Sequence, residues 1–214
     1  ATLREVFNHK TVSEVVMVDL DEEIIKLSKM YLPNHSKGAF EDERLKLFHT
    51  DARAYLLNSE KKYDVIILDL VDPLEEGTAY QLYTKEFYEI VNASLNEGGI
   101  MVTQSGSSDI TNFAECYVPI VHTIRSVFTH VSNYQVNISA FGMPWSFTMA
   151  SQHKFDYENC PLNSPDAVAS RVHETLKFYD KESHSHMFSV PKYVRDRIAI
   201  QTTINSDDNP IFMI

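Results

Sequence analysis

The stretch Glu14-Val15-Val16-Met17-Val18-Asp19 decides the fold class. Its unbroken apolar centre is typical of a strand that is buried on both faces of a parallel sheet. Two similar stretches follow at Leu45–His49 and Tyr63–Leu68, and an aspartate comes within two residues of each. A fourth strand is predicted over Ile100–Thr103, directly after a Gly-Gly turn. The chain therefore carries a series of buried strands with acids at their carboxyl ends.

Helical patterns separate these strands. Ile24, Leu27 and Tyr31 recur at helical spacing after the first strand, and Pro33 ends that helix. Further helices are predicted over residues 52–56, 87–95 and 113–128, with Thr84 as a cap and Pro119 as a kink. Alternating strands and helices predict a doubly wound, mostly parallel α/β sheet. In such a sheet, ligands bind beyond the carboxyl ends of the strands.

The C-terminal part follows a different pattern. Residues 131–139 and 146–151 are predicted to form an antiparallel hairpin at one edge of the sheet, and Pro165 is predicted at the first position of a helix. We expect a catalytic α/β core over residues 1–160 and a helical extension of the same domain over residues 161–214.

The totals limit the classes of function. The formal net charge is −11, which argues against a nucleic-acid partner because phosphates require a basic surface. An acidic cleft attracts a cationic small molecule, although an acidic surface can also serve solubility alone. Cys116 and Cys160 make neither a disulfide framework nor a metal site. We expect a reducing, cytoplasmic location and no membrane partner, since the sequence has no signal peptide and no apolar run of 18 residues.

Three successive strand ends carry an aspartate, namely Asp19, Asp51 and Asp69. A single aspartate after a strand often caps the next helix, but three in series favour a nucleoside site. A carboxylate at Asp19 can accept both ribose hydroxyls. Asp51 can accept from an adenine amino group, and the small Ala52 leaves room for the flat base. This layout is typical of enzymes that use S-adenosylmethionine or one of its derivatives.

The segment Asp69-Leu70-Val71-Asp72-Pro73 places two carboxylates three residues apart at one strand end. Pro73 keeps Asp72 extended, so that its side chain can turn into a cleft. One acid can hold the charge of an amine and the other can take a proton from it, because a free alkylamine has a pKa near ~10. The alternative is a loop stabilised by an Asx-turn.

These residues resemble the polyamine aminopropyltransferases, the spermidine and spermine synthase family. Residues 69–73 and the run Tyr80-Gln81-Leu82-Tyr83-Thr84-Lys85-Glu86-Phe87-Tyr88 are similar to the family's active-site strand and gate loop. Residues 3–6 with 15–21, residues 99–104 and residues 176–180 are similar to further family segments. The resemblance covers about residues 1 to 200 and implies a Rossmann-like sheet of the S-adenosylmethionine-methyltransferase type.

The resemblance also implies roles for individual residues. Asp69 matches the family's proton acceptor, and the residues that match polyamine contacts are Asp72, Gln104 and Tyr80. Asp19 matches the ribose-binding acid, and Asp51 with Ala52 matches the adenine contact. The implied reaction moves an aminopropyl group from decarboxylated S-adenosylmethionine to a polyamine, with neither a metal nor a cofactor. A homodimer or homotetramer of the full-length protein is expected.

Within the family the sequence is most similar to thermospermine synthases, which share the Asp-Ala pair at Asp51-Ala52 and the Tyr-Gln-Leu-Tyr gate. Spermidine to thermospermine is therefore the expected reaction, with putrescine to spermidine next. The family's Gly-rich loop and N-terminal β-hairpin domain are expected before Ala1, so the chain alone is expected to be nearly inactive. A small-molecule methyltransferase and a non-catalytic nucleoside-binding fragment are the alternatives. The lone Trp145 is expected to pack in the core or to stack on a substrate chain.

Overall fold

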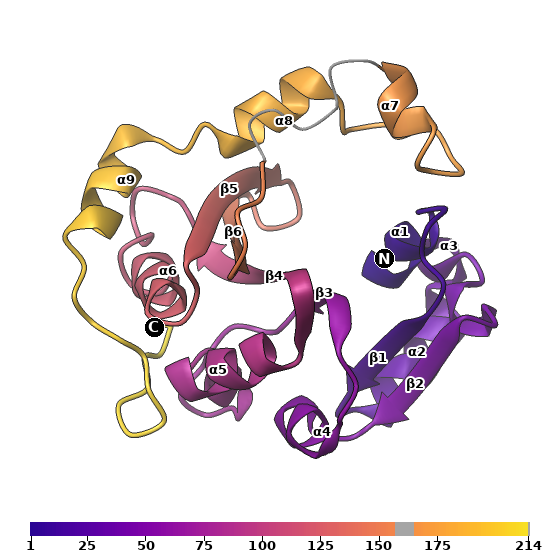
Figure 1. Cartoon of the computed structure of the whole chain (residues 1–214), viewed down its shortest axis with the longest axis horizontal. Coiled ribbons are helices and arrows are strands. Elements are labelled where there is room, and N and C mark those ends of the chain that lie inside the picture. The colour runs from indigo at the N-terminus through magenta and orange to yellow at the C-terminus, as the bar shows by residue number, and fades with distance from the viewer. Residues whose placement is uncertain (157–164, 214) are drawn as a thin grey trace. The chain divides into compact units, whose positions relative to one another are not determined.

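We describe a computed structural model of the chain, which covers residues 1–156 and 165–213. The chain forms two compact units (Figure 1). Unit 1 contains residues 1–59 and the described part of 157–181, and unit 2 contains residues 60–156 and 182–213. Cys160 and the domain boundary predicted at residues 160/161 lie outside the described residues.

Unit 1 is built around two parallel strands, β1 (Val15–Asp19) and β2 (Leu45–His49). Both follow their predicted bounds within one residue, because each is an apolar run between polar punctuation. The helical elements of the unit are α1 (Thr2–Phe7), α2 (Glu22–Tyr31), α3 (Pro33–Ser36), the 3₁₀ helix η1 (Ala39–Glu41), α4 (Ala52–Asn58) and α7 (Pro165–Ala169). Its buried apolar residues are Phe7, Ile25, Ala39 and Val172.

Unit 2 contains a four-stranded mixed sheet in the order β3-β4-β6-β5. The strands are β3 (Tyr63–Leu68), β4 (Leu95–Ser107), β5 (His130–Ile138) and β6 (Met143–Ser151). β3 and β4 run parallel, whereas β6 pairs antiparallel with both β4 and β5. The hairpin predicted at the sheet edge is therefore confirmed, with β5 as the edge strand. The acids after β1 and β2 belong to one sheet, and the acids after β3 belong to another.

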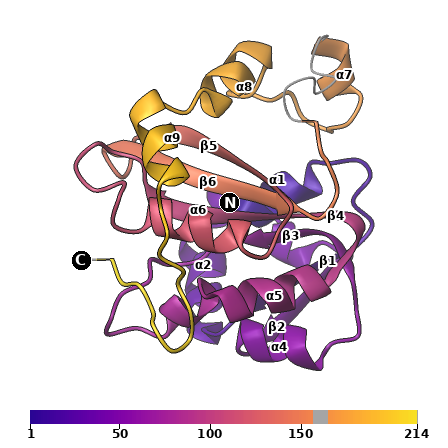
Figure 2. The same cartoon turned by 60° about the vertical axis from the view of Figure 1, so that its left-hand side comes forward.

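The helices of unit 2 are η2 (Ala79–Leu82, 3₁₀), α5 (Lys85–Ala93), α6 (Tyr117–Arg125), α8 (Lys181–Phe188) and α9 (Lys192–Ala199). Thr84 caps α5 as predicted, because its Oγ1 accepts the N–H of Phe87. Figure 2 shows α9 beside α6, and a cluster of buried side chains joins these two helices. The cluster consists of Tyr117, Val118, Val121, Val190, Val194 and Ile198.

The long helix predicted over residues 113–128 is shorter than expected. α6 covers only Tyr117–Arg125, and the residues before it form turns. Pro119 lies in the first turn of α6, where a missing N–H costs nothing because that N–H has no helical partner. It therefore does not kink the helix. The apolar spacing extends beyond both ends of α6 because Phe113 and Phe128 also pack inward. The ring centroids of Phe113 and Tyr193 are 5.3 Å apart, and Phe128 is only 3% exposed.

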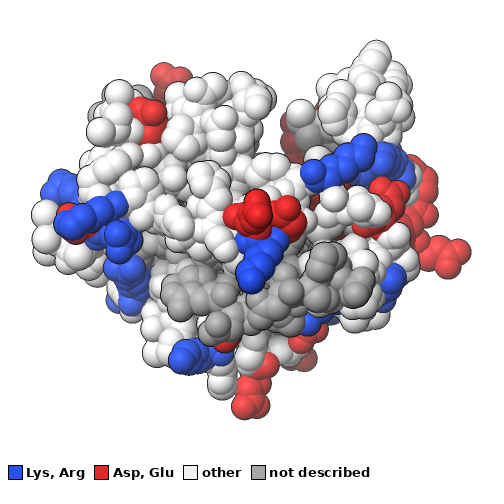
Figure 3. All heavy atoms as spheres, turned by 90° about the horizontal axis from the view of Figure 1, so that it is seen from above, with Lys and Arg blue, Asp and Glu red and all other residues white. Residues whose placement is uncertain are grey.

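Two further features of the chain are the length of its apolar helices and the distribution of charged side chains on the surface. None of the helices within residues 1–156 and 165–213 combines the length and the apolar run needed to cross a bilayer. On the face shown in Figure 3, basic and acidic side chains of the described residues are interspersed among uncharged atoms.

Candidate active site

Asp19 ends β1 and turns its carboxylate back onto the chain. Its Oδ1 accepts the N–H of Asp21 at 2.9 Å, and its backbone carbonyl accepts from the N–H of Thr50 at 3.2 Å. Asp21 in turn caps α2 by accepting the N–H groups of Glu23 and Ile24. Backbone N–H groups of Asp21 and Thr50 thus hold Asp19 at the strand end, and its side chain is half-buried.

Asp51 follows β2 and caps α4. Its Oδ1 accepts the N–H of Ala54 at 2.6 Å, and Ala52 is the first residue of the helix. The capping role that a single strand-end aspartate often takes is therefore present at this position. A shallow depression of about 350 Å³ lies beside the cap, lined by Thr50, Ala54, Tyr55, Asn58 and Ser59. Asp51 and Asp19 both belong to unit 1.

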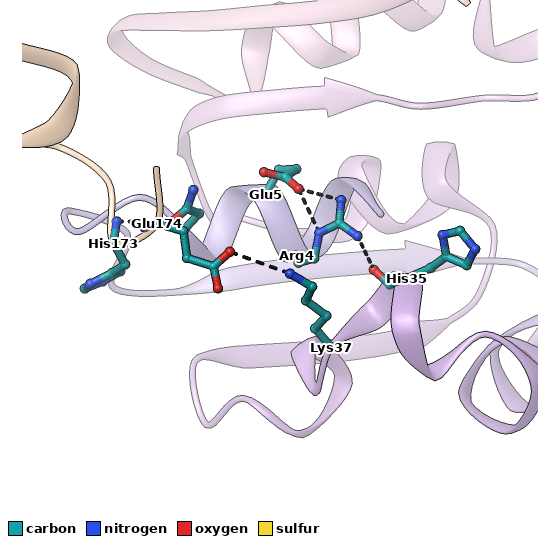
Figure 4. Close-up of polar contacts among 7 residues, drawn as sticks. Arg4, Glu5, His35, Lys37, His173 and Glu174 are labelled. Atoms are coloured by element: carbon teal, nitrogen blue, oxygen red, sulfur yellow. Dashed lines mark hydrogen bonds and ion pairs between the residues drawn. The ribbon is translucent and has the colours of Figure 1, made fainter. Parts of the chain in front are cut away.

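Polar contacts inside unit 1 connect the end of α1 and the residue after α3 with the segment that follows α7 (Figure 4). Asn8 Oδ1 accepts the N–H groups of His173 and Glu174, at 3.0 and 2.7 Å. The Glu174 carboxylate lies 3.6 Å from Lys37 Nζ, and His9 forms an antiparallel bridge with Val172. Residues 172–174 thereby fix the end of α1, which leads into β1.

Asp69 and Asp72 follow β3 in unit 2, as the sequence predicted. Asp69 is exposed, whereas Asp72 is half-buried and precedes the buried Pro73. Asp72 Oδ1 accepts a hydrogen bond from Gln104 Nε2 at 3.2 Å. The structure therefore brings Asp72 together with Gln104 of β4, a residue that was singled out from the family resemblance alone.

Gln104 is the centre of a buried hydrogen-bond network. Its Nε2 also donates to Tyr83 Oη and lies 3.2 Å from the carbonyl oxygen of Leu70. Its Oε1 accepts from Trp145 Nε1 at 2.9 Å. Tyr83 Oη donates onward to the carbonyl oxygen of Val71 at 3.0 Å. The network thus supports the backbone of the loop that carries Asp72.

Burial keeps the Tyr83 hydroxyl and the nearby Cys116 thiol protonated. Burial, with the nearby Tyr88 and Asp72 charges, raises the pKa of Tyr83 far above its usual value, so its hydroxyl remains a donor. Burial, together with the charge of Asp72, raises the pKa of the Cys116 thiol to about 12. Asp72 therefore faces neutral groups rather than competing anions on this side.

The run that resembles the family's gate loop, residues 80–88, is held by a C-terminal segment that no sequence pattern had indicated. Asn205 is fully buried, and its Nδ2 donates to the carbonyl oxygen of Tyr83 at 3.1 Å. Thr84 Oγ1 donates to Asp207 Oδ1 at 2.7 Å. Tyr80, a predicted polyamine contact, packs edge-on against Phe212 with ring centroids 5.2 Å apart. The gate loop is thus anchored by residues more than 120 positions further along the chain.

The chain is similar in sequence to known enzymes of polyamine metabolism. Residues 1–162 match the spermine/spermidine synthase domain family. The chain is 40% identical over 217 residues to a polyamine aminopropyltransferase of Saccharolobus islandicus, and 38% identical over 213 residues to polyamine aminopropyltransferase 2 of Hyperthermus butylicus. Each match covers 100% of this chain and 69% of the relative.

Solved structures show the same fold. The spermidine synthase of Thermotoga maritima has a TM-score of 0.77 at 24% identity, over 94% of this chain and 65% of that one. A spermidine synthase in complex with the transition-state analogue AdoDATO has a TM-score of 0.76 over 94% of this chain and 64% of its own. The chain therefore spans about two thirds of the length of these proteins, and their likeness confirms the predicted Rossmann-like α/β fold. With a family match over residues 1–162 and relatives of 40% identity along the whole chain, this protein belongs to the spermine/spermidine synthase family.

Proposed function

We propose that this chain carries the catalytic site of a polyamine aminopropyltransferase. The observation that supports this most directly is the pair of acids after β3, of which Asp72 is backed by the Gln104 network. A methyltransferase on a similar sheet has no need of two carboxylates at this strand end. The names of the curated relatives point to the same reaction.

In the proposed reaction, a neutral amine of the polyamine attacks the methylene carbon next to the sulfonium of decarboxylated S-adenosylmethionine. A carbon–nitrogen bond forms, the carbon–sulfur bond breaks, and its electron pair leaves with sulfur as methylthioadenosine. Asp69 accepts the proton of the attacking amine, while Asp72 binds and orients the polyamine with Tyr80 and Gln104 nearby. Alignment of nucleophile and leaving group supplies most of the acceleration.

The donor side of the proposal rests on unit 1. Asp19 is assigned to the ribose hydroxyls, and Asp51 with Ala52 is assigned to adenine. The Asp51-Ala52 pair and the gate sequence around Tyr80 favour spermidine as acceptor and thermospermine as product, with putrescine as the second candidate. The reaction as proposed uses decarboxylated S-adenosylmethionine as a co-substrate and requires neither a metal nor a redox cofactor.

Replacement of the proposed base tests this function. Asp69→Asn keeps the shape of the side chain but cannot take the proton, so in the full-length enzyme the turnover rate should fall by roughly 10²–10⁴. Affinity for methylthioadenosine, measured by titration calorimetry, should stay within twofold. Turnover is followed by chromatography of the product formed from decarboxylated S-adenosylmethionine and spermidine, with putrescine assayed in parallel.

The matched control is Asp72→Asn, which should raise the Michaelis constant for the polyamine more than it lowers the maximal rate. Near-normal turnover of Asp69→Asn together with loss of turnover in Asp72→Asn would reverse the two roles. If both variants retain wild-type kinetics, the acidic pair is a structural turn and the proposed function is wrong.

A further inference from the structure

We propose that Trp145 and Tyr83 are positioning residues that hold Gln104 with its amide nitrogen toward Asp72, so that Gln104 acts on the polyamine through that carboxylate. The identity of the ligand rests on the proposed function. The hydrogen bonds that carry the inference are independent of it, because all four side chains belong to unit 2.

Two donors determine which way the Gln104 amide faces. Trp145 Nε1 and the backbone N–H of Gly106 both lie 2.9 Å from the same atom of Gln104. An indole N–H and a backbone N–H can only donate, so that atom must be the carbonyl oxygen Oε1. Gly106 reaches this position because β4 bulges between Gln104 and Ser107, where Gly106 has a φ of +85°. A residue with a side chain would be strained there.

The other end of the amide meets only acceptors. Gln104 Nε2 contacts Asp72 Oδ1 and the Leu70 carbonyl oxygen, each at 3.2 Å, and also Tyr83 Oη. The Tyr83 hydroxyl donates its hydrogen to the Val71 carbonyl oxygen, so its oxygen accepts the hydrogen bond from Gln104 Nε2. The hydrogen bonds therefore run in one direction, from Trp145 through Gln104 to Tyr83 and Asp72.

This direction decides what Gln104 can do with an amine. An ammonium or amine hydrogen needs an acceptor, and the only acceptor of the Gln104 side chain is Oε1. That oxygen already accepts two hydrogen bonds, and the residue is only 7% exposed. Gln104 instead fixes Asp72 Oδ1 by donation, which assigns Oδ2 of the same carboxylate to the amine. Trp145→Phe removes the side-chain donor of the two that orient the amide and leaves an aromatic ring in place.

The first experiment reads the hydrogen bond itself. Trp145 is the one tryptophan of the sequence, so its indole N–H gives a single resonance in a ¹H–¹⁵N spectrum of uniformly labelled protein. Gln104→Leu removes the acceptor, and the indole proton should move upfield and exchange with solvent at least tenfold faster. An unchanged shift and exchange rate would overturn the proposed positioning.

The second experiment asks whether Trp145 acts through Asp72. Spermidine is titrated by calorimetry into the full-length protein as wild type, Trp145→Phe, Asp72→Asn and the double variant, in the presence of methylthioadenosine. We expect Asp72→Asn to weaken binding at least tenfold and Trp145→Phe to weaken it three- to tenfold. In the double variant the loss should equal that of Asp72→Asn within twofold.

The outcomes separate this inference from the function on which it rests. If Trp145→Phe weakens binding by the same factor with and without Asp72, Trp145 contacts the polyamine directly and the inference is wrong. Phe141→Leu is the packing control, because the Phe141 ring lies 4.7 Å from Trp145 but outside the hydrogen bonds, and it should leave the affinity within twofold. An equal loss in Phe141→Leu would reduce Trp145 to a packing residue. If wild type binds no spermidine while the indole resonance responds to Gln104→Leu, the proposed function fails and the positioning stands.

Discussion

Asp51 accepts the N–H of Ala54, three residues away, whereas Asp72 accepts from Gln104, which lies 32 residues away on β4. Asp19 resembles Asp51, because its partner is the N–H of Asp21 two residues on. The acids of unit 1 are therefore oriented by local turns at the surface. Asp72 of unit 2 is oriented by a buried side-chain network. A carboxylate of the first kind can be moved by a small backbone change, while the second kind depends on distant residues.

The largest expected effect tests the buried side of this comparison. Gln104→Glu preserves shape but, at neutral pH, replaces a donor with a carboxylate oxygen that faces Asp72 Oδ1 and the Leu70 carbonyl oxygen. The free energy of unfolding should fall by about 3 kcal/mol, the scale of an uncompensated buried charge. Urea unfolding followed by circular dichroism measures this loss.

The pH dependence of that loss has a definite sign. The introduced carboxyl would have its pKa raised in the folded state, so the destabilisation is present above its unfolded value of ~4.3 and fades as the pH falls toward it. The control Gln81→Glu makes the same change at an exposed position of the gate loop and should stay within about 0.5 kcal/mol. Equal losses in the two variants would contradict a buried network.

The second effect tests the local side. Asp19→Ala removes a carboxylate proposed to accept both ribose hydroxyls, and methylthioadenosine should bind about 1.5–3 kcal/mol more weakly. Calorimetry measures the affinity, and Glu22→Ala, at the start of α2, is the matched acidic control. An unchanged affinity in Asp19→Ala would remove this residue from the donor site and leave it with its turn alone.

The contrast also explains what the sequence could predict. β1, β2 and β3 were predicted within one residue because an apolar run and its flanking polar residues are local signals. The strand-end acids followed from those bounds. By contrast, Trp145 was expected either to pack or to stack on substrate. Its bond to Gln104 spans 41 residues and requires both the β4–β6 pairing and the bulge at Gly106. No local pattern encodes that combination.

The same limit appears at Tyr83 and Thr84 in the gate loop. Thr84 was predicted as a cap because capping acts within one helical turn. Its hydroxyl also donates to Asp207, which lies 123 residues further along the chain, and this contact was not predicted. The Asn205 side chain likewise reaches Tyr83 across 122 residues. Long-range polar contacts of this kind decide how the site is held, whereas local contacts decide which residues arrive at its edge.

The third effect concerns alkaline pH and the buried thiol beside Asp72. The folded state holds the pKa of Cys116 at about 12, whereas an unperturbed thiol has a value of 9.0. Between these values the unfolded chain releases a proton that the folded chain keeps, so the unfolding free energy falls by up to ~1.4 kcal/mol per pH unit. Urea unfolding between pH 8 and 10 should be steeper in pH for wild type than for Cys116→Ala. Parallel slopes would show that this thiol is open to solvent.

The smallest effect separates the two roles at Asp51. Asp51→Ala deletes the cap of α4 and should lower the unfolding free energy by about 1 kcal/mol. Asp51→Ser keeps a capping oxygen, so its stability should return to within a few tenths of a kcal/mol of wild type. A serine hydroxyl is nevertheless shorter and uncharged, and it should not restore the acceptor proposed for the adenine amino group. Methylthioadenosine affinity should therefore stay weakened in Asp51→Ser although stability recovers. If affinity and stability recover together, the cap is the only role of Asp51, and Asp51 then shapes a helix without contacting the adenine.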